Sequence, residues 1–214
     1  MLILGTTTAS AQYRKKKPQI IVPDTVPLFN GFQVSADLLG AAMMHLGSYG
    51  QYEGALRLNL RDRYFPIVEL GYGKADHTDD GTQLNYKTKA PYGRVGVDLN
   101  LMKDKHDAYR LLAGVRYGFT SFKYDVFHPS VVDPVWGDLV EFRAEGVQAK
   151  YHWMEVVFSV DATIWGPLHL GWSVRYRNRL SHNAGELDNV WYVPGYGKSG
   201  KSVLGGTFNV IIDI

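Results

Sequence analysis

The chain has 214 residues, enough for one all-β domain, and a formal net charge of +2 at pH 7. That balance gives no global electrostatic reason to expect a nucleic acid or an acidic partner. The absence of cysteine excludes disulfide bonds and thiolate metal sites. No apolar run approaches the roughly 20 residues of a membrane-spanning helix. Twenty-three glycines, 14 tyrosines and five tryptophans are typical of a barrel with aromatic rims.

The first 30 residues are expected to lie outside the folded domain. Residues 1–11 predict a partial signal peptide, because a short apolar piece precedes the small-residue cleavage pattern Ala9-Ser10-Ala11. Residues 12–30 predict a basic, proline-containing periplasmic tether, since Pro23 and Pro27 oppose a central strand. The tether contains a basic cluster, Arg14-Lys15-Lys16-Lys17. This cluster either contacts anionic headgroups or cell-wall polymer, or is part of a solvated linker.

Residues 31–214 alternate apolar with polar side chains, which is the period of a β-strand. The clearest example is Leu56-Arg57-Leu58-Asn59-Leu60-Arg61. Several segments reach the roughly 9–11 residues of a tilted strand that crosses a bilayer. The first strand is the least regular, because alternation is lost over 39–44. The eight expected strands are 31–45, 51–61, 65–76, 88–102, 108–124, 149–165, 168–180 and 201–214.

The connections between these strands alternate in length. In an up-and-down barrel, successive connections fall at opposite ends, and outer-membrane barrels have short periplasmic turns and longer outer loops. We therefore expect both chain termini at the short-turn, periplasmic end. The short connections are 62–64, 103–107 and 165–167, and the long ones are 77–87, 125–148 and 181–200.

The polar faces of the strands carry six acids and six arginines, and none of the 12 lysines lies at the middle of an expected strand. Arginine is favoured over lysine where a planar fork must satisfy carboxylates with little water present. Buried charges must also be paired. We therefore predict an enclosed interior salt-bridge network made of Asp37, Arg57, Arg61, Glu69, Arg94, Asp98, Arg116, Glu155, Asp161, Arg175, Arg177 and Asp213.

The chain resembles the small outer-membrane β-barrels of the OmpA/OmpX type. The resemblance rests on eight amphipathic strands, an export signal, alternating loop lengths and a terminal amphipathic strand, Phe208–Ile214. The resemblance covers 31–214 and implies an all-β, eight-stranded antiparallel up-and-down transmembrane β-barrel, exported to the bacterial outer membrane after cleavage of its signal peptide. It implies two partners, outer-membrane lipid and the insertion machinery that reads the C-terminal strand. Such barrels usually end in an aromatic residue, whereas this chain ends in Ile214. An uncharacterised group of short outer-membrane proteins is the other match, and it carries no activity over.

Catalytic and metal-binding patterns are mostly missing, so we expect a protein that is not an enzyme and has no cofactor or metal. The seven histidines form no H-x-x-x-H pattern. The segment Asp76–Gly81 is better explained as a hairpin turn than as a calcium loop. The segment Gly195–Ser202 lacks the strand and helix context of a phosphate-binding loop.

Two outer loops carry aromatic residues that form the candidate interaction surface. They either bind a glycan or a partner protein, or pack on one another to close the barrel mouth. The residues are Phe127, Trp136, Trp191, Tyr192 and Tyr196.

The leading hypothesis is a non-enzymatic outer-membrane barrel with a plugged, charge-paired interior that acts as a structural or interaction protein through its outer loops. One alternative is a soluble lipocalin-like carrier, whose apolar face would line a ligand cavity. Another is a lipid-modifying membrane enzyme, for which His152, His169 and His182 are the candidates. A narrow channel is the last alternative.

Overall fold

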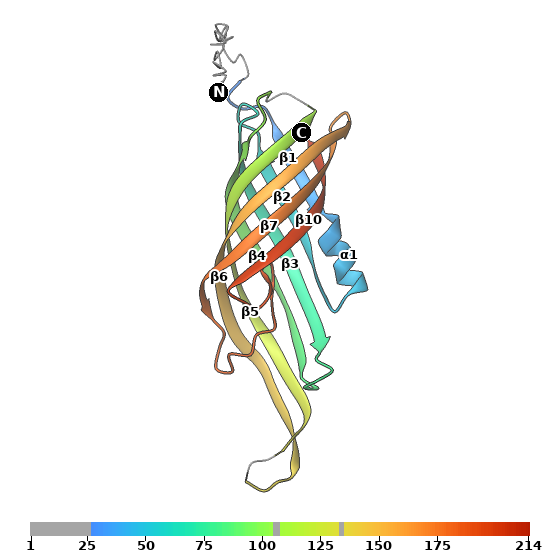
Figure 1. Ribbon diagram of the computed structural model, residues 1–214, viewed down its shortest axis with the longest axis vertical. Helices are drawn as coiled ribbons and strands as arrows, with labels where there is room; N and C mark the ends of the chain where they lie inside the picture. Colours follow the sequence, from blue (N-terminus) through green and yellow to red (C-terminus); the bar gives the residue numbers. More distant parts are fainter. Residues whose placement is uncertain (1–26, 105–107, 133–134) are drawn as a thin grey trace, which may run out of the picture.

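The computed structural model describes residues 27–104, 108–132 and 135–214. The predicted signal peptide and most of the predicted tether lie outside these residues. Eight strands close into an antiparallel barrel in the order β1-β10-β7-β6-β5-β4-β3-β2 (Figure 1). The strands are β1 (Phe32–Asp37), β2 (Tyr49–Leu58), β3 (Tyr64–Thr78), β4 (Asn85–Asn100), β5 (Tyr109–Val132), β6 (Leu139–Trp165), β7 (Leu168–Asn183) and β10 (Ser202–Asp213). The predicted eight-stranded up-and-down barrel is confirmed.

The first and last strands of the barrel, β1 and β10, pair with each other and close the sheet. The Phe32 amide donates to the Ile214 carbonyl at 3.2 Å, and the Ile214 amide donates to the Phe32 carbonyl at 2.8 Å. This closure lies at the end of the barrel that carries the short turns, while the long connections lie at the opposite end (Figure 1). The alternating layout of the connections is therefore as predicted.

Alternation along each strand separates two surfaces of opposite character. Outward side chains are apolar, as shown by Leu70 and Trp172, which are 67% and 64% exposed. Inward side chains are often ionised, and Arg94 and Glu155 are fully buried at 0% exposure. A lipocalin-like carrier needs the reverse arrangement, with apolar side chains lining the cavity. The orientation of the two faces therefore disagrees with that alternative.

The predicted first strand, 31–45, is wrong beyond Asp37. There the chain forms the helix α1 (Leu38–Leu46). The Asp37 side chain caps this helix by accepting the amides of Leu39 at 3.0 Å and Gly40 at 3.2 Å. It also accepts the amide of Phe208 in the neighbouring β10 at 3.2 Å. The Asp37 carboxylate thus caps the start of α1 and also binds the neighbouring strand β10.

Helix α1 lies outside the barrel wall, against β2 (Figure 1). The contact is close because both surfaces carry glycine: a Cβ on Gly50 of β2 would lie 2.2 Å from the Met44 backbone nitrogen. No helix among the described residues is long and apolar enough to cross a membrane. Strand β1 pairs with β10 only from Gln33 to Asp37. Beyond Asp37 the chain continues as α1 instead of pairing further along β10.

The segment 125–148, predicted as a loop, is mostly strand. Strands β5 and β6 continue as a paired hairpin as far as Val132 and Leu139, with register shifts after Tyr124 and after His128. The hairpin projects well beyond the other loops (Figure 1). The long connection expected at 125–148 is therefore an outward extension of β5 and β6.

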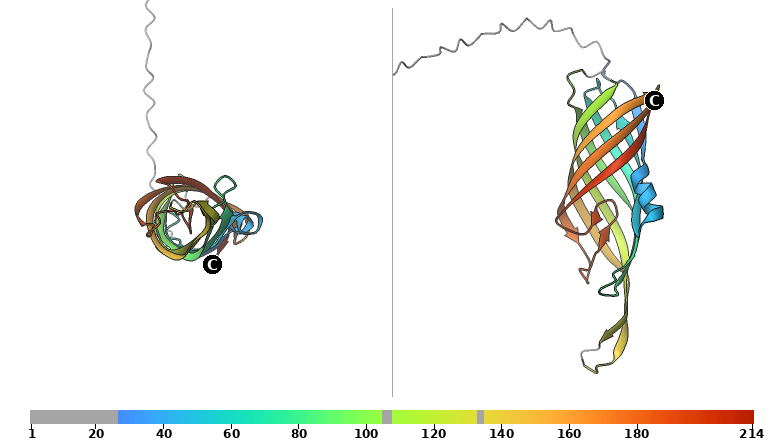
Figure 2. Two further views of the ribbon diagram at one scale, coloured as in Figure 1. Left: turned by 90° about the horizontal axis from the view of Figure 1, so that it is seen from below. Right: turned by 45° about the vertical axis from the view of Figure 1, so that its right-hand side comes forward.

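The last long loop also contains strand. A two-stranded sheet pairs β8 (Tyr192–Val193) with β9 (Gly197–Lys198). This small sheet lies within the ring of the barrel when the molecule is viewed along its long axis (Figure 2). The mouth of the barrel is therefore occupied by its own chain.

We expect Gly50→Ala to destabilise the barrel, because the added methyl group would collide with the backbone of α1. Overpacking of this kind costs about 1–3 kcal/mol. The matched control is Gly54→Ala, on the outward face of the same strand, where the nearest atom to a Cβ is 3.7 Å away. Urea unfolding in detergent micelles measures both, and equal stability of the two variants would contradict the close packing of α1 on β2.

Candidate functional site

The interior of the barrel is organised around Glu69, a carboxylate that is 1% exposed. Arg94 Nη1 lies 2.9 Å from Glu69 Oε2, and Arg175 Nη1 lies 2.8 Å from the same oxygen. Arg116 Nε donates to Glu69 Oε1 at 3.1 Å. Three guanidinium groups from β4, β5 and β7 thus converge on one acid of β3.

Further ion pairs extend the network along the barrel axis in both directions. Arg57 pairs with Asp98 at 3.2 Å and with Asp161 at 2.8 Å. Arg116 binds Asp98 through both terminal nitrogens, a bidentate geometry. Glu155 lies 2.8 Å from Arg94 Nε and 3.3 Å from Arg177 Nε. Nine of the 12 predicted network residues meet in this way: Arg57, Glu69, Arg94, Asp98, Arg116, Glu155, Asp161, Arg175 and Arg177.

The other three predicted members have different roles. Arg61 is exposed in the turn after β2, with a positive φ of 57°, so it is not part of the interior. Asp37 caps α1. Asp213 lies at the short-turn rim, where its Oδ2 is 3.0 Å from His169 Nε2 and 3.7 Å from Arg110 Nη2. Asp37 is thus engaged by backbone amides, whereas Arg61 and Asp213 lie at strand ends, away from the central ion pairs.

The sequence prediction missed two residues of the network. Glu53, which the predicted network does not include, accepts from Arg94 Nη1 at 2.6 Å and lies 3.2 Å from Arg175 Nη1. The Tyr92 hydroxyl donates to the same carboxylate at 2.6 Å. The alternation along β2 shows that the Glu53 side chain points inward. How far along the barrel axis Glu53 lies depends on the register between strands, which one strand does not show.

Small residues on the inward face provide the space that these large side chains need. A Cβ on Gly114 would fall on the Asp98 carboxylate, and one on Gly118 would lie 2.2 Å from the Trp153 ring. An eight-stranded barrel is only just wide enough for side chains to fill. Alternating glycine with Arg, Trp or Tyr is how this chain fills it.

The mouth of the barrel is closed by a plug, defined here as residues 190–200, which include β8 and β9. Arg94 Nη2 donates to the Gly195 carbonyl at 2.6 Å, and Arg177 Nη1 donates to the Tyr196 carbonyl at 2.9 Å. The Tyr86 hydroxyl donates to the Tyr192 carbonyl at 2.8 Å. Two arginines of the ionic network therefore also hold the plug.

The five candidate loop aromatics separate into two groups. Trp191, Tyr192 and Tyr196 belong to the plug, where Tyr192 and Tyr196 are 2% and 0% exposed. For this loop the option of closing the barrel mouth is confirmed. Phe127 is half-buried on the β5 side of the hairpin, and Trp136 at its tip is 80% exposed. These two residues do not meet the others.

Not every aromatic residue near a strand end lies in an outward belt. Tyr124 and Trp153 are 1% and 0% exposed and pack in the cluster beneath the plug. Tyr109, Tyr117 and Tyr176 are exposed on the outer wall, as expected for a belt. Tyr124 has the parity of the inward Arg116, and Trp153 has that of the inward Glu155, so strand alternation already places both inside.

The histidines proposed for a lipid-modifying enzyme are separated. His169 Nδ1 is 2.9 Å from the Thr163 hydroxyl at the short-turn rim, and its Nε2 faces Asp213 rather than Asp161. His152 Nδ1 is 2.8 Å from the Tyr117 hydroxyl on the outer wall. His182 contacts the Tyr151 ring near the opposite end. The three do not converge on one site.

The β3–β4 connection folds as the predicted turn. The Asp79 carboxylate accepts the Thr82 amide at 2.8 Å, the Thr82 hydroxyl at 3.0 Å and the Gly81 amide at 3.0 Å. These hydrogen bonds hold the pKa of the Asp79 carboxyl below its ordinary value, and those from Thr82 have the largest effect. The carboxylate thus stabilises the turn itself.

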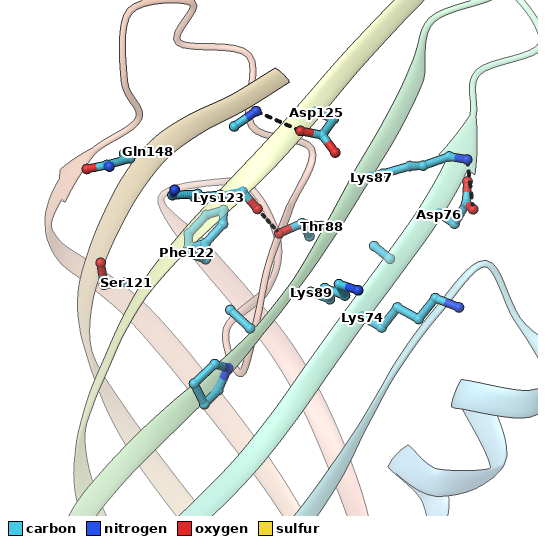
Figure 3. A pocket seen from close by; sticks show the side chains of 14 residues that line it. Lys74, Asp76, Lys87, Thr88, Lys89, Ser121, Phe122, Lys123, Asp125 and Gln148 are labelled. Carbon is cyan, nitrogen blue, oxygen red and sulfur yellow. Dashed lines mark hydrogen bonds and ion pairs between the residues drawn. The ribbon is translucent and has the colours of Figure 1, made fainter. Parts of the chain in front are cut away.

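A groove of about 810 Å³ lies on the outer wall, near the loop end of β3, β4, β5 and β6 (Figure 3). Its charged rim is formed by Lys74, Lys87, Lys89 and Lys123, with Asp76 and Asp125 beside them. These lysines belong to strands, because the strands are longer than expected. They face outward, so these four strand lysines do not enter the ionic network.

A family model described as "Domain of unknown function (DUF6048)" matches residues 1–213. The chain belongs to this family. The predicted relation to the OmpA/OmpX type is therefore too specific, and the relation to an uncharacterised group agrees with the match. None of the curated proteins matches the chain.

Three solved structures are similar to this DUF6048 chain. The crystal structure of CarO2 from Acinetobacter baumannii has 13% identity and a TM-score of 0.45, over 87% of this chain and 99% of that one. A major outer membrane protein from Thermus thermophilus has 14% identity and a TM-score of 0.45, over 86% and 98%. CarO from Acinetobacter baumannii has 12% identity and a TM-score of 0.43, over 90% and 100%.

We expect Glu69→Gln to be strongly destabilising, because it leaves three buried guanidinium groups without their shared anion. Removing one partner of a buried ion pair costs about 3–5 kcal/mol. The matched control is Glu141→Gln on the exposed hairpin, where Glu141 pairs with Arg143 at 3.3 Å. Exposed pairs contribute at most about 1 kcal/mol. Urea unfolding in detergent that leaves both variants equally stable would contradict the role of Glu69.

Proposed function

We propose that this DUF6048 chain is a non-enzymatic outer-membrane barrel with a sealed interior, which acts as a structural or interaction protein through its projecting hairpin. The observation that carries the proposal is the combination of an apolar outer wall with an interior filled by ion pairs and a plug. The apolar outer wall favours lipid as the surrounding medium. The filled interior favours a function at the outer surface of the barrel over the passage of solutes through it.

The outer wall supports a membrane location by the position of its apolar residues. On β4, the outward residues from Pro91 to Leu99 are uncharged, and the next outward residue is Lys89. On β3 the corresponding stretch runs from Pro66 to Tyr72, followed by Lys74. An apolar band flanked by aromatic and charged residues is the pattern of a barrel that crosses a bilayer. In water the same surface would favour aggregation.

The filled interior supports a function without a pore. The network around Glu69 occupies the middle of the barrel, and the plug occupies the loop end. Between them, Trp153 packs edge-on against Tyr196, with ring centroids 5.7 Å apart. A continuous aqueous path would require the ion pairs and the plug to separate together.

The β5–β6 hairpin is the surface offered to a partner. Its tip exposes Val135, Trp136 and Leu139, with 76%, 80% and 69% of their surface accessible. Apolar and aromatic side chains at the end of a rigid projection are suited to contact a protein or a glycan. The paired strands below the tip fix its direction and reduce the entropy lost on binding.

A unique thiol tests this location and orientation, because the natural chain has no cysteine. We expect Trp136→Cys to react in intact cells with a maleimide coupled to a polymer too large to pass the outer membrane. The control, Lys103→Cys in the turn after β4, should react only after the outer membrane is permeabilised. Labelling of Lys103→Cys alone in intact cells would invert the barrel. Recovery of both variants in the soluble fraction would contradict the membrane location.

A further inference from the structure

The groove on the outer wall contains a pair of like charges that the sheet register brings together. Lys74 of β3 is paired directly with Lys89 of β4. Two lysines therefore lie side by side across β3 and β4, adjacent in Figure 3. Lys123 of β5 lies on the other side of the groove, where β4 and β5 are not paired.

This pair of lysines is electrostatically unfavourable by itself. Side chains directly opposite one another have Cβ atoms about 5 Å apart, and like charges at this spacing are destabilising. Within the described part of the chain, Lys74, Lys89 and Lys123 form no ion pair. The nearby acids are engaged elsewhere: Asp76 pairs with Lys87 at 3.4 Å, and Asp125 accepts the Gly146 amide at 2.7 Å. An anion bound from outside the protein would relieve this repulsion.

The wall at this place is hollowed, because the pairing of β4 with β5 is interrupted. Paired residues stop at Thr88 and Tyr124 and resume at Tyr92 and Thr120. Pro91 lies in the interval and has no amide hydrogen to donate. The Thr88 hydroxyl bridges the opening by donating to the Lys123 carbonyl at 2.8 Å. The resulting groove has small or apolar residues below the lysines, namely Ala75, Ala90 and Phe122.

The level of this pair on the barrel indicates what the anion is. The next outward pair toward the middle of the wall is Tyr72 with Pro91, the end of the apolar band. In the proposed membrane orientation the lysines would lie at the headgroups of the outer leaflet. We propose that this groove binds the phosphate groups of an anionic outer-leaflet lipid, with lipid A as the headgroup of matching chemistry. A volume of about 810 Å³ accommodates a phosphorylated sugar, and the apolar floor accommodates the start of an acyl chain.

This inference rests on the proposed membrane location and is tested on the whole folded chain in detergent micelles. Native mass spectrometry measures binding of bisphosphorylated lipid A, of the same lipid after removal of both phosphates, and of inorganic phosphate. The test variant is Lys74→Gln/Lys89→Gln. The control, Lys103→Gln/Lys201→Gln, removes the same charge from exposed lysines outside the groove.

We expect the test variant to lose affinity for bisphosphorylated lipid A by about 25-fold, since each lysine near an anionic surface contributes about fivefold. The control variant should bind like the natural chain, and the dephosphorylated lipid should bind weakly to all three. In micelles without lipid A, the test variant should be at least as heat-stable as the natural chain, because one repulsive pair is gone.

Equal binding by the test and control variants would overturn the proposal, as would equal binding of lipid A with and without its phosphates. Inorganic phosphate that binds as tightly as lipid A would identify a free-anion site instead and would also overturn it. The failure of the membrane location is distinguishable, because it would appear in cell fractionation of the natural chain. A natural chain found in the outer membrane, with unchanged lipid A binding in the test variant, would refute the lipid site alone.

Discussion

The convergence of three guanidinium groups on Glu69 is the constraint on which the rest of the barrel depends. Arg94, Arg116 and Arg175 each reach this carboxylate from a different strand, so the register of β3, β4, β5 and β7 is coupled through one side chain. Removing charges from water is costly, and the cost is recovered only when every partner is in place. A pairing shifted by one residue would direct these side chains to the outer wall.

The same arginines connect the wall to the mouth. Arg94 and Arg177 each hold a carbonyl of the plug as well as an acid of the network. The plug is therefore fixed by buried charges of the network, and its tyrosines cover those charges from water. Movement of the plug would remove a hydrogen-bond acceptor from Arg94 and from Arg177, so the plug and the network stabilise each other.

Much of the fold was predictable, because a period of two and the choice of arginine over lysine are visible along a single strand. Those signals identified eight strands, the inward face and nine of the 12 network residues. The errors lie where the answer depends on neighbouring strands. Loss of alternation after Asp37 indicated an irregular strand but not a helix packed on Gly50, and the glycine-rich plug had no periodicity. The adjacent lysines of the groove were not predictable, because Lys74 and Lys89 are brought together only by register.

Single-channel recording in planar bilayers tests most directly whether this barrel is sealed by its own ion pairs and plug. The folded protein, identified by a change in gel mobility between unboiled and boiled samples, is added to the bilayer beside a porin as positive control. We expect insertion without stable openings. Long-lived openings of uniform conductance from the natural chain would show a continuous aqueous path and contradict the sealed interior.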